Sequence, residues 1–130
     1  MTALLVDDSP AMRLFLRRVL DVSGLNIQCV LEAGNGREAL ECLHARWVDL
    51  VLCDVNMPEM NGEQFLAALS NSDSRTAHPC VIVISTDSTT SRVERVLRLG
   101  ASGFLRKPFT PEQVRTIVNN VMEAGNVPRD

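Results

Sequence analysis

The chain alternates short apolar runs with longer stretches of helical periodicity along its whole length. The apolar runs cover residues 3–6, 27–31, 50–53, 81–84 and 103–105. Short runs bounded by polar residues are typical of buried strands, and strands that alternate with helices pair in parallel. The pattern therefore predicts an α/β fold with a five-stranded parallel sheet and five flanking helices.

Two of the predicted helices carry apolar stripes that should pack on this sheet. The stripes consist of Met12, Phe15, Leu16, Val19 and Leu20 in the first helix, and of Val114, Ile117, Val118, Val121 and Met122 in the last. The polar stretch 70–79 is predicted to be a surface loop before the fourth strand. Gly125 and Pro128 predict the end of the last helix.

Four helix starts carry N-cap signatures, in which a short polar side chain can accept a hydrogen bond from a free backbone N–H. They are Ser9-Pro10, Asn35-x-x-Glu38, Ser91-x-x-Glu94 and Thr110-Pro111-x-Gln113. These signatures predict where each helix should begin.

Length and composition exclude several classes of protein. The 130 residues show no internal linker, so we expect one domain over residues 1–130. No apolar run approaches the roughly 18 residues of a membrane span. The start turns acidic at Asp7, unlike a signal peptide, which favours a cytoplasmic location and no membrane partner. A net charge of −3 offers no basic surface, so direct binding to nucleic acid is not expected.

The four cysteines indicate core thiols. Cys29, Cys42, Cys53 and Cys80 lie in apolar stretches without C-x-x-C spacing. This spacing does not favour a zinc site or a thioredoxin-like redox motif.

Carboxylates follow two of the predicted strands. Asp7 and Asp8 end the first apolar run, and Asp54 ends the third. If these strands are neighbours, the acids meet at the carboxyl edge of the sheet, where open α/β folds bind ligands. Carboxylates about 4 Å apart repel by about 4 kcal/mol per pair at an effective dielectric of 20, so the cluster needs protonation or a cation. Mg²⁺ prefers such ligands, and a carboxylate beside it can attack phosphorus, which makes Asp54 the candidate nucleophile.

Two further strand ends supply complementary groups. Ser85 follows the fourth apolar run, and Lys107 comes shortly after the fifth. Phosphoryl transfer needs chiefly positioning and charge neutralisation, which a hydroxyl, an ammonium group and a metal provide. Taken singly, each residue is ordinary: a helix-start acid, a turn residue or a surface lysine. Their joint placement at four strand ends favours a phosphoryl site.

These residues resemble the receiver domains of two-component response regulators, particularly the stand-alone chemotaxis type. The matching motifs are Leu5-Val6-Asp7-Asp8-Ser9, Asp54-Val55-Asn56-Met57-Pro58 with Asn61-Gly62, Ile84-Ser85-Thr86, and residues 100–109. The resemblance implies a flavodoxin-like, doubly wound sheet with strand order 2-1-3-4-5. It also implies a phosphorelay switch rather than a turnover enzyme.

By this resemblance Asp54 is the phosphoacceptor. Asp7, Asp8 and Asp54, with the backbone carbonyl of Asn56, would hold Mg²⁺ as the cofactor. Lys107 would contact the phosphoryl group, and its bond to the following proline would be cis. The phosphodonor would be a phosphohistidine of a sensor histidine kinase or a histidine phosphotransfer protein.

The resemblance also implies a switch between two states. Ser85 would bond a phosphoryl oxygen and Phe104 would rotate inward, altering the surface of the fourth helix, fifth strand and fifth helix that meets a downstream target protein. Phe104 stands where tyrosine is frequent in chemotaxis members, so the two states would differ by packing alone. Asn56 and Asp87 occupy positions that tune hydrolysis in the family. We expect both to admit or orient water and to shorten the phosphoryl lifetime.

Arginines gather on the same expected output surface. Arg92, Arg95 and Arg98 are spaced along the fourth predicted helix, and Arg106 lies on the neighbouring strand. A solvated helix face is the simplest explanation. The arginines would also suit an acidic partner or a symmetric homodimer through this surface.

Three alternatives are less favoured by the sequence. A degenerate receiver would be a phosphorylation-independent interaction module, although its acids, hydroxyl and lysine are intact. An aspartyl-phosphate phosphatase of the haloacid dehalogenase type would need a second Asp where Asn56 stands. A flavin carrier would need a phosphate-cradling loop where Asp7 and Asp8 would repel phosphate. The chain could also be a receiver cut from a longer regulator or hybrid kinase.

Overall fold

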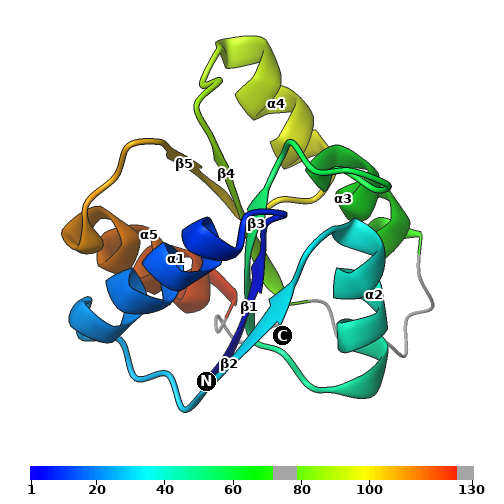
Figure 1. The fold of residues 1–130 in the computed structure, drawn as a ribbon. Helices are drawn as coiled ribbons and strands as arrows, with labels where there is room; N and C mark the ends of the chain where they lie inside the picture. The colour runs from blue at the N-terminus through cyan, green and yellow to red at the C-terminus, as the bar shows by residue number, and fades with distance from the viewer. Residues whose placement is uncertain (72–78, 126–130) are drawn as a thin grey trace, which may run out of the picture.

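Five short strands lie side by side in one parallel sheet (Figure 1). They are β1 (Thr2–Val6), β2 (Cys29–Ala33), β3 (Leu50–Asp54), β4 (Cys80–Ser85) and β5 (Gly103–Arg106). The computed structural model describes residues 1–71 and 79–125. Within these residues the strand order is β2-β1-β3-β4-β5, which confirms the predicted doubly wound topology.

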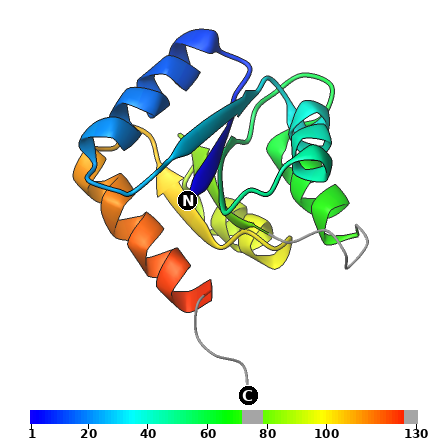
Figure 2. The same cartoon turned by 90° about the horizontal axis from the view of Figure 1, so that it is seen from below.

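Helices cover both faces of the sheet (Figures 1 and 2). On one face lie α1 (Pro10–Val22) and α5 (Pro111–Gly125), and on the other lie α2 (Gly36–Ala45), α3 (Gly62–Ser70) and α4 (Thr90–Arg98). The connection after β1 runs to one side and the connection after β3 to the other. Open α/β folds bind their ligands at such a reversal, here at the carboxyl ends of β1 and β3.

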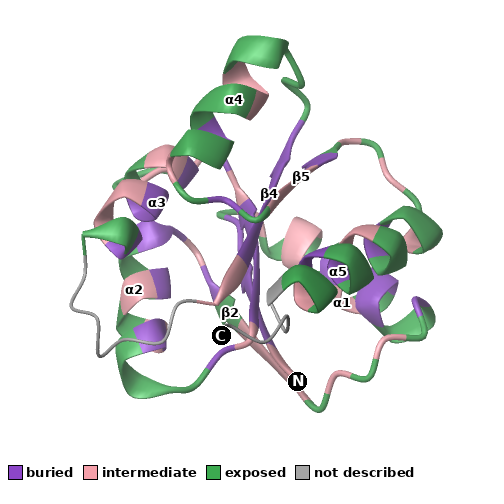
Figure 3. Ribbon diagram, turned by 180° about the vertical axis from the view of Figure 1, so that it is seen from behind, coloured by how far each residue is buried: buried purple, intermediate pink, exposed green. Residues whose placement is uncertain are grey.

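Side chains of the central strands alternate between two buried layers. In β1, Leu4 and Val6 share a cluster with α2 and α3, while Ala3 and Leu5 share one with α1 and α5. All four are fully buried, and Figure 3 shows the buried colour running along the central strands. Burial on both faces fixes the register, because a one-residue slip would exchange the two layers. The residues that follow each strand are therefore held in defined positions.

The second strand differs from the prediction. It covers Cys29–Ala33 rather than residues 27–31, and its register pairs Thr2 with Cys29 and Val6 with Ala33. Ile27 lies before the strand and packs against the α1 and α5 cluster. An apolar loop residue and an apolar strand residue look the same in sequence, which explains the shift of two residues.

The predicted stripe of α1 is confirmed except at one position. Leu16, Val19 and Leu20 are buried, whereas Phe15 is 45% exposed. The Phe15 ring lies beside that of Phe109, with centroids 5.8 Å apart. This aromatic pair therefore lies at the surface, near the carboxyl edge of the sheet.

Three of the four predicted N-caps are confirmed. The side chains of Ser9, Asn35 and Thr110 each accept a hydrogen bond from the backbone N–H three residues on. The prediction for Ser91 is wrong, because the N-cap of α4 is Thr89, whose Oγ1 accepts a backbone N–H at 3.4 Å. Adjacent threonines and serines offer equivalent caps, so sequence alone does not choose among them.

Most of the predicted loop 70–79 and the predicted stop at Pro128 lie outside the described residues; Ser70 itself ends α3. No helix in the described part of the chain is long and apolar enough to cross a membrane.

Candidate functional site

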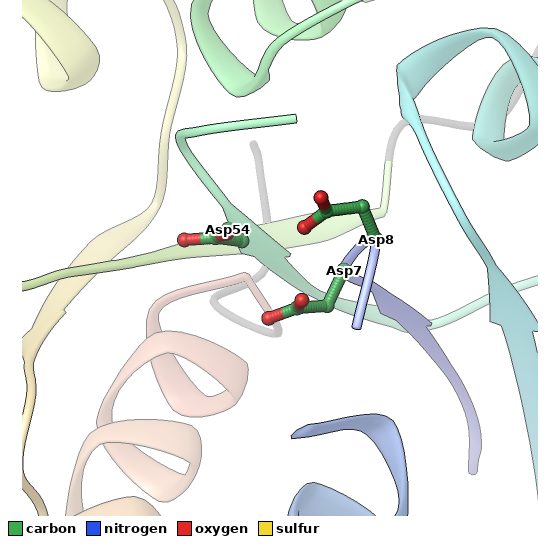
Figure 4. Close-up of side chains that lie close together, drawn as sticks. All are labelled: Asp7, Asp8 and Asp54. Atoms are coloured by element: carbon green, nitrogen blue, oxygen red, sulfur yellow. The ribbon is translucent and has the colours of Figure 1, made fainter. Parts of the chain in front are cut away.

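The three predicted carboxylates meet at the carboxyl edge of the sheet (Figure 4). β1 and β3 are direct neighbours, with Val6 opposite Cys53. Asp7 and Asp54, the residues that follow Val6 and Cys53, therefore lie next to each other. Carboxylate oxygens of Asp7, Asp8 and Asp54 all lie within 4.8 Å of one another. The cluster forms an acidic pocket whose oxygen donors suit a hard cation.

Asp7 is the most buried acid of this pocket, with 3% of its surface exposed. Its Oδ1 accepts the Ser9 N–H at 2.9 Å. Burial raises the pKa of Asp7 above its usual range, and the Asp54 carboxylate adds to this, while the Ser9 hydrogen bond and Lys107 oppose it. The pocket therefore carries negative charge that its own residues do not fully compensate.

We expect Asp7→Asn to stabilise the protein in the absence of divalent cations. Asparagine keeps an oxygen that can accept the Ser9 N–H but removes a charge that burial disfavours. Because the folded-state pKa of Asp7 is raised, the ionised carboxylate opposes folding, and its protonated form stabilises the fold at acidic pH. That stabilisation is lost as the pH rises through the folded-state pKa.

Thermal unfolding in a chelator tests this expectation. At pH 7 the Tm of the variant should exceed that of the unaltered protein by a few degrees. The difference should shrink as the pH is lowered through the raised pKa of Asp7, because the unaltered Asp7 then becomes protonated. An equal or lower Tm at pH 7 would show that the charge of Asp7 is compensated in the folded protein.

Lys107 and Ser85 complete the group at the sheet edge. Lys107 Nζ lies 3.4 Å from Asp54 Oδ1, and the Lys107 backbone N–H donates to the Ser85 carbonyl at 3.0 Å. Ser85 is buried, and its Oγ accepts the backbone N–H of Asp87 at 3.0 Å. Asp7, Asp8 and Lys107 thus lie close to Asp54, and Ser85 ends the neighbouring strand β4 and contacts the Lys107 backbone.

A comparison with known protein families matches residues 3–119 to the response regulator receiver domain. The chain belongs to this family. Receivers are signalling modules rather than classical enzymes, they normally bind Mg²⁺ at an acidic pocket, and they interact with histidine kinases and downstream effectors.

The chain spans most of some curated relatives and little more than half of others. The chain is 38% identical to the chemotaxis protein CheY1 of Helicobacter pylori over 88% of its own length and 91% of that protein. It is 33% identical to the transcriptional regulatory protein UhpA of Salmonella typhimurium over 95% of its length, but it spans only 60% of UhpA.

Solved structures show the same fold. The chemotaxis protein CheY4 of Vibrio cholerae superposes with a TM-score of 0.79 at 31% identity, covering 92% of this chain and 97% of CheY4. The receiver domain of a histidine kinase from Syntrophus aciditrophicus gives a TM-score of 0.82 at 29% identity, covering 99% of this chain and 95% of that one.

The remaining predicted site residues are Asn56, Asp87 and Phe104. Asn56 and Asp87 are exposed, and Phe104 is half-buried against the cluster beneath α3 and α4. Asp87 Oδ1 accepts the Thr89 N–H at 3.1 Å, a bond that lowers the pKa of Asp87. The bond between Lys107 and the following proline is cis, as the resemblance implied.

The loop between β3 and α3 is held from two sides, which the sequence did not reveal. Gly62 N–H donates to the Val55 carbonyl at 2.9 Å, closing the loop that carries Asn56. Glu59 adopts a left-handed φ of 64°, and its carboxylate pairs with Arg37 at 3.1 Å. No local sequence pattern predicts this ion pair, because Arg37 lies in the first turn of α2 and Glu59 lies 22 residues later, in the loop before α3.

Two of the arginines predicted to face a partner are already paired within the receiver. Arg92 Nη1 lies 2.7 Å from Glu63 Oε2, and Arg95 Nη1 lies 3.3 Å from Glu63 Oε1. These contacts join α4 to the first turn of α3. Arg98 and Arg106 are exposed and, among the described residues, make no ion pair.

An apolar surface lies beside Lys107. On α1, Leu14 and Phe15 are 49% and 45% exposed. A shallow cavity next to them is lined by Met12, Phe15, Thr86, Lys107, Pro108 and Phe109. We call these residues, with Leu14, the α1 rim.

Proposed function

We propose that this receiver accepts a phosphoryl group on Asp54 from the phosphohistidine of a sensor histidine kinase or a histidine phosphotransfer protein. The observation that carries the proposal is the convergence on Asp54 of two further carboxylates and the Lys107 ammonium group. Such a set serves phosphoryl transfer, in which charge and position matter more than acid–base chemistry.

Asp54 acts as the nucleophile. One of its carboxylate oxygens attacks the phosphorus of phosphohistidine, an oxygen–phosphorus bond forms, and the phosphorus–nitrogen bond breaks. The imidazole nitrogen leaves with the bonding electron pair and takes up a proton from solvent. Lys107 and the Ser85 hydroxyl are placed to stabilise the transferred group, the first by charge and the second by a hydrogen bond.

Mg²⁺ fits the residues present. The oxygens of Asp7, Asp8 and Asp54 surround one pocket, and burial already disfavours the charge on Asp7. We assign these carboxylates, with the backbone carbonyl of Asn56, to holding the ion. When bound, the ion neutralises negative charge on the carboxylates and on the incoming phosphoryl oxygens.

The α1 rim is the surface that we assign to the phosphodonor. It exposes Leu14 and Phe15, and Phe15 lines the same cavity as Lys107, so a partner that covers it is brought next to Asp54. Exposed apolar patches rimmed by polar groups mark sites of protein association. A donor whose histidine projects from an amphipathic helix would cover the patch and reach the pocket together.

The phosphoryl group is removed by water. A water oxygen attacks the phosphorus, and the bond to Asp54 breaks with its electrons returning to the carboxylate. Inorganic phosphate leaves with the water oxygen and its two protons, one of which passes to solvent. Asn56 and Asp87 are exposed and follow Asp54 and Ser85 by two residues, and the pKa of Asp87 is lowered by its hydrogen bond from the Thr89 N–H. We assign both side chains to orienting this water.

We expect Asp87→Ala to slow the loss of the phosphoryl group by up to about tenfold, which is below the roughly 10²–10⁴-fold effect of a general acid or base, because Asp87 only orients water. Asp87→Asn is the matched control, because it keeps an oxygen that can accept the Thr89 N–H and removes only the charge. Decay of the phosphorylated protein, followed by intact mass, gives the rate. An unchanged rate in both variants would remove Asp87 from the hydrolysis step.

Phosphorylation would shift the receiver between two states of the surface formed by α4, β5 and α5. Ser85 and Phe104 are the residues that we assign to this switch, and a downstream target protein would distinguish the states. Exposed Arg98 and Arg106 suit an acidic target or a homodimer through the same surface.

Acetyl phosphate with Mg²⁺ tests the proposal directly. Intact mass should show the addition of one phosphoryl group, and the addition should vanish in a chelator. Absence of an adduct, together with no binding of the stable phosphoryl mimic beryllium fluoride, would favour the degenerate receiver that acts without phosphorylation.

A further inference from the structure

Arg13 on α1 holds the turn that carries two of the pocket acids. Its Nη1 donates to the backbone carbonyl of Asp7 at 2.6 Å, and its side chain is only 19% exposed. Its Nε donates to Glu32 Oε1 on β2 at 2.8 Å. The guanidinium group therefore connects the turn after β1 to the neighbouring strand.

Glu32 is shared by two arginines, and they differ in what else they contact. Arg17 Nη2 lies 2.8 Å from Glu32 Oε2 and 3.4 Å from the Val30 carbonyl, away from the pocket. The two arginines lower the pKa of Glu32, Arg17 with the larger effect. Only Arg13 reaches the turn after β1, so the two residues form a natural comparison.

Hydrogen bonds hold both polar groups of the Asp7 backbone, whereas the Asp8 side chain has no such support among the described residues. The Asp7 N–H donates to the Ala33 carbonyl at 3.1 Å, and the Asp7 carbonyl accepts the bond from Arg13. Asp8 is exposed, and in residues 1–71 and 79–125 no hydrogen bond or ion pair holds its side chain. The position of the Asp8 carboxylate is thus set by the peptide that Arg13 holds.

We propose that Arg13, oriented by Glu32, is a positioning residue for the cation pocket. It holds the peptide between Asp7 and Asp8 so that both carboxylates are placed for Mg²⁺ before the ion arrives. The charges that act on the Asp7 carboxyl come from Asp54, Lys107 and Asp8 rather than from Arg13, so Arg13 acts through the backbone. This inference rests on the Mg²⁺ pocket of the proposed function.

The test compares Arg13→Met with Arg17→Met in the unphosphorylated full chain. Both variants remove one ion pair to Glu32, but only the first frees the Asp7 carbonyl. Outer-shell partners of metal ligands typically contribute 10–100-fold to affinity, so Arg13→Met should weaken Mg²⁺ binding about tenfold. Arg17→Met should leave the affinity within about twofold of the unaltered protein, since it touches no pocket residue.

Mg²⁺ affinity is measured by following amide resonances of the pocket during a Mg²⁺ titration, with circular dichroism as the check on folding. If Arg13→Met does not fold, Arg13→Lys and Arg17→Lys carry the same comparison, because lysine cannot make both of the Arg13 contacts at once. Equal affinities in the matched pair would overturn the role of Arg13 and leave the proposed function standing. If the unaltered protein binds no Mg²⁺, the metal pocket itself fails.

Discussion

Replacing Asp54 with asparagine will abolish phosphorylation by acetyl phosphate. An amide oxygen is a far weaker nucleophile than a carboxylate, and no other carboxylate in the described part of the chain contacts Lys107. Asp7 is 3% exposed and already accepts a hydrogen bond, so it is poorly placed to substitute. The adduct seen with the unaltered protein should therefore disappear rather than decrease.

Intact mass, followed by peptide mapping, measures this loss. The control is Asp8→Asn, which leaves the nucleophile in place and should raise the Mg²⁺ concentration required without removing the adduct. Circular dichroism should show that Asp54→Asn folds, because the variant loses an ion pair with Lys107 but also loses the repulsion from the Asp7 and Asp8 carboxylates. A phosphoryl group that maps to another residue in the variant would contradict the assignment.

Gly62→Ala will destabilise the fold by about 3 kcal/mol, at the upper end of typical overpacking effects. A Cβ at this position would lie 2.6 Å from the Asp54 carbonyl oxygen and 2.9 Å from Val55 Cα. Both neighbours are backbone atoms of the segment that presents Asp54, so relief requires the loop to move. The variant should therefore lose phosphorylation rate as well as stability.

Gly34→Ala is the matched control for this prediction. Its Cβ would meet only the flexible Glu38 carboxylate, at 3.5 Å or more, so its stability should change by about 0.5 kcal/mol or less. Urea denaturation of both variants gives the free energies of unfolding. If Gly62→Ala unfolds at the same urea concentration as Gly34→Ala, the loop has more freedom than its contacts indicate.

The sheet and the pocket were predictable because both follow from where strands end. Five apolar runs predicted the strands, and parallel pairing then required Asp7, Asp54 and Ser85 to share one edge. No knowledge of side-chain contacts was needed for this step. The boundaries of β2 and the N-cap of α4 were less predictable, because equivalent residues lie on both sides of each boundary.

Contacts between distant segments could not be predicted in this way. Arg92 and Arg95 pair with Glu63 because α3 and α4 pack next to each other in the fold. The spacing of the arginines along the helix alone indicated an unpaired basic face. Phe15 has the spacing of a core residue but lies beyond the edge of the sheet, beside Phe109. Arg13 resembles any helix-surface arginine until Glu32 and the Asp7 carbonyl are seen beside it.

The order in which the strand ends appear along the chain bears on protein synthesis. Asp7 and Asp54 emerge early from the ribosome, but Lys107 emerges late, and β5 takes its place beside β4 only after it has been made. A nascent or truncated chain that stops before β5 would carry the acids without the ammonium group that completes the set. If Asp54 is the acceptor that we propose, phosphorylation would therefore require a molecule in which β5 has joined the sheet.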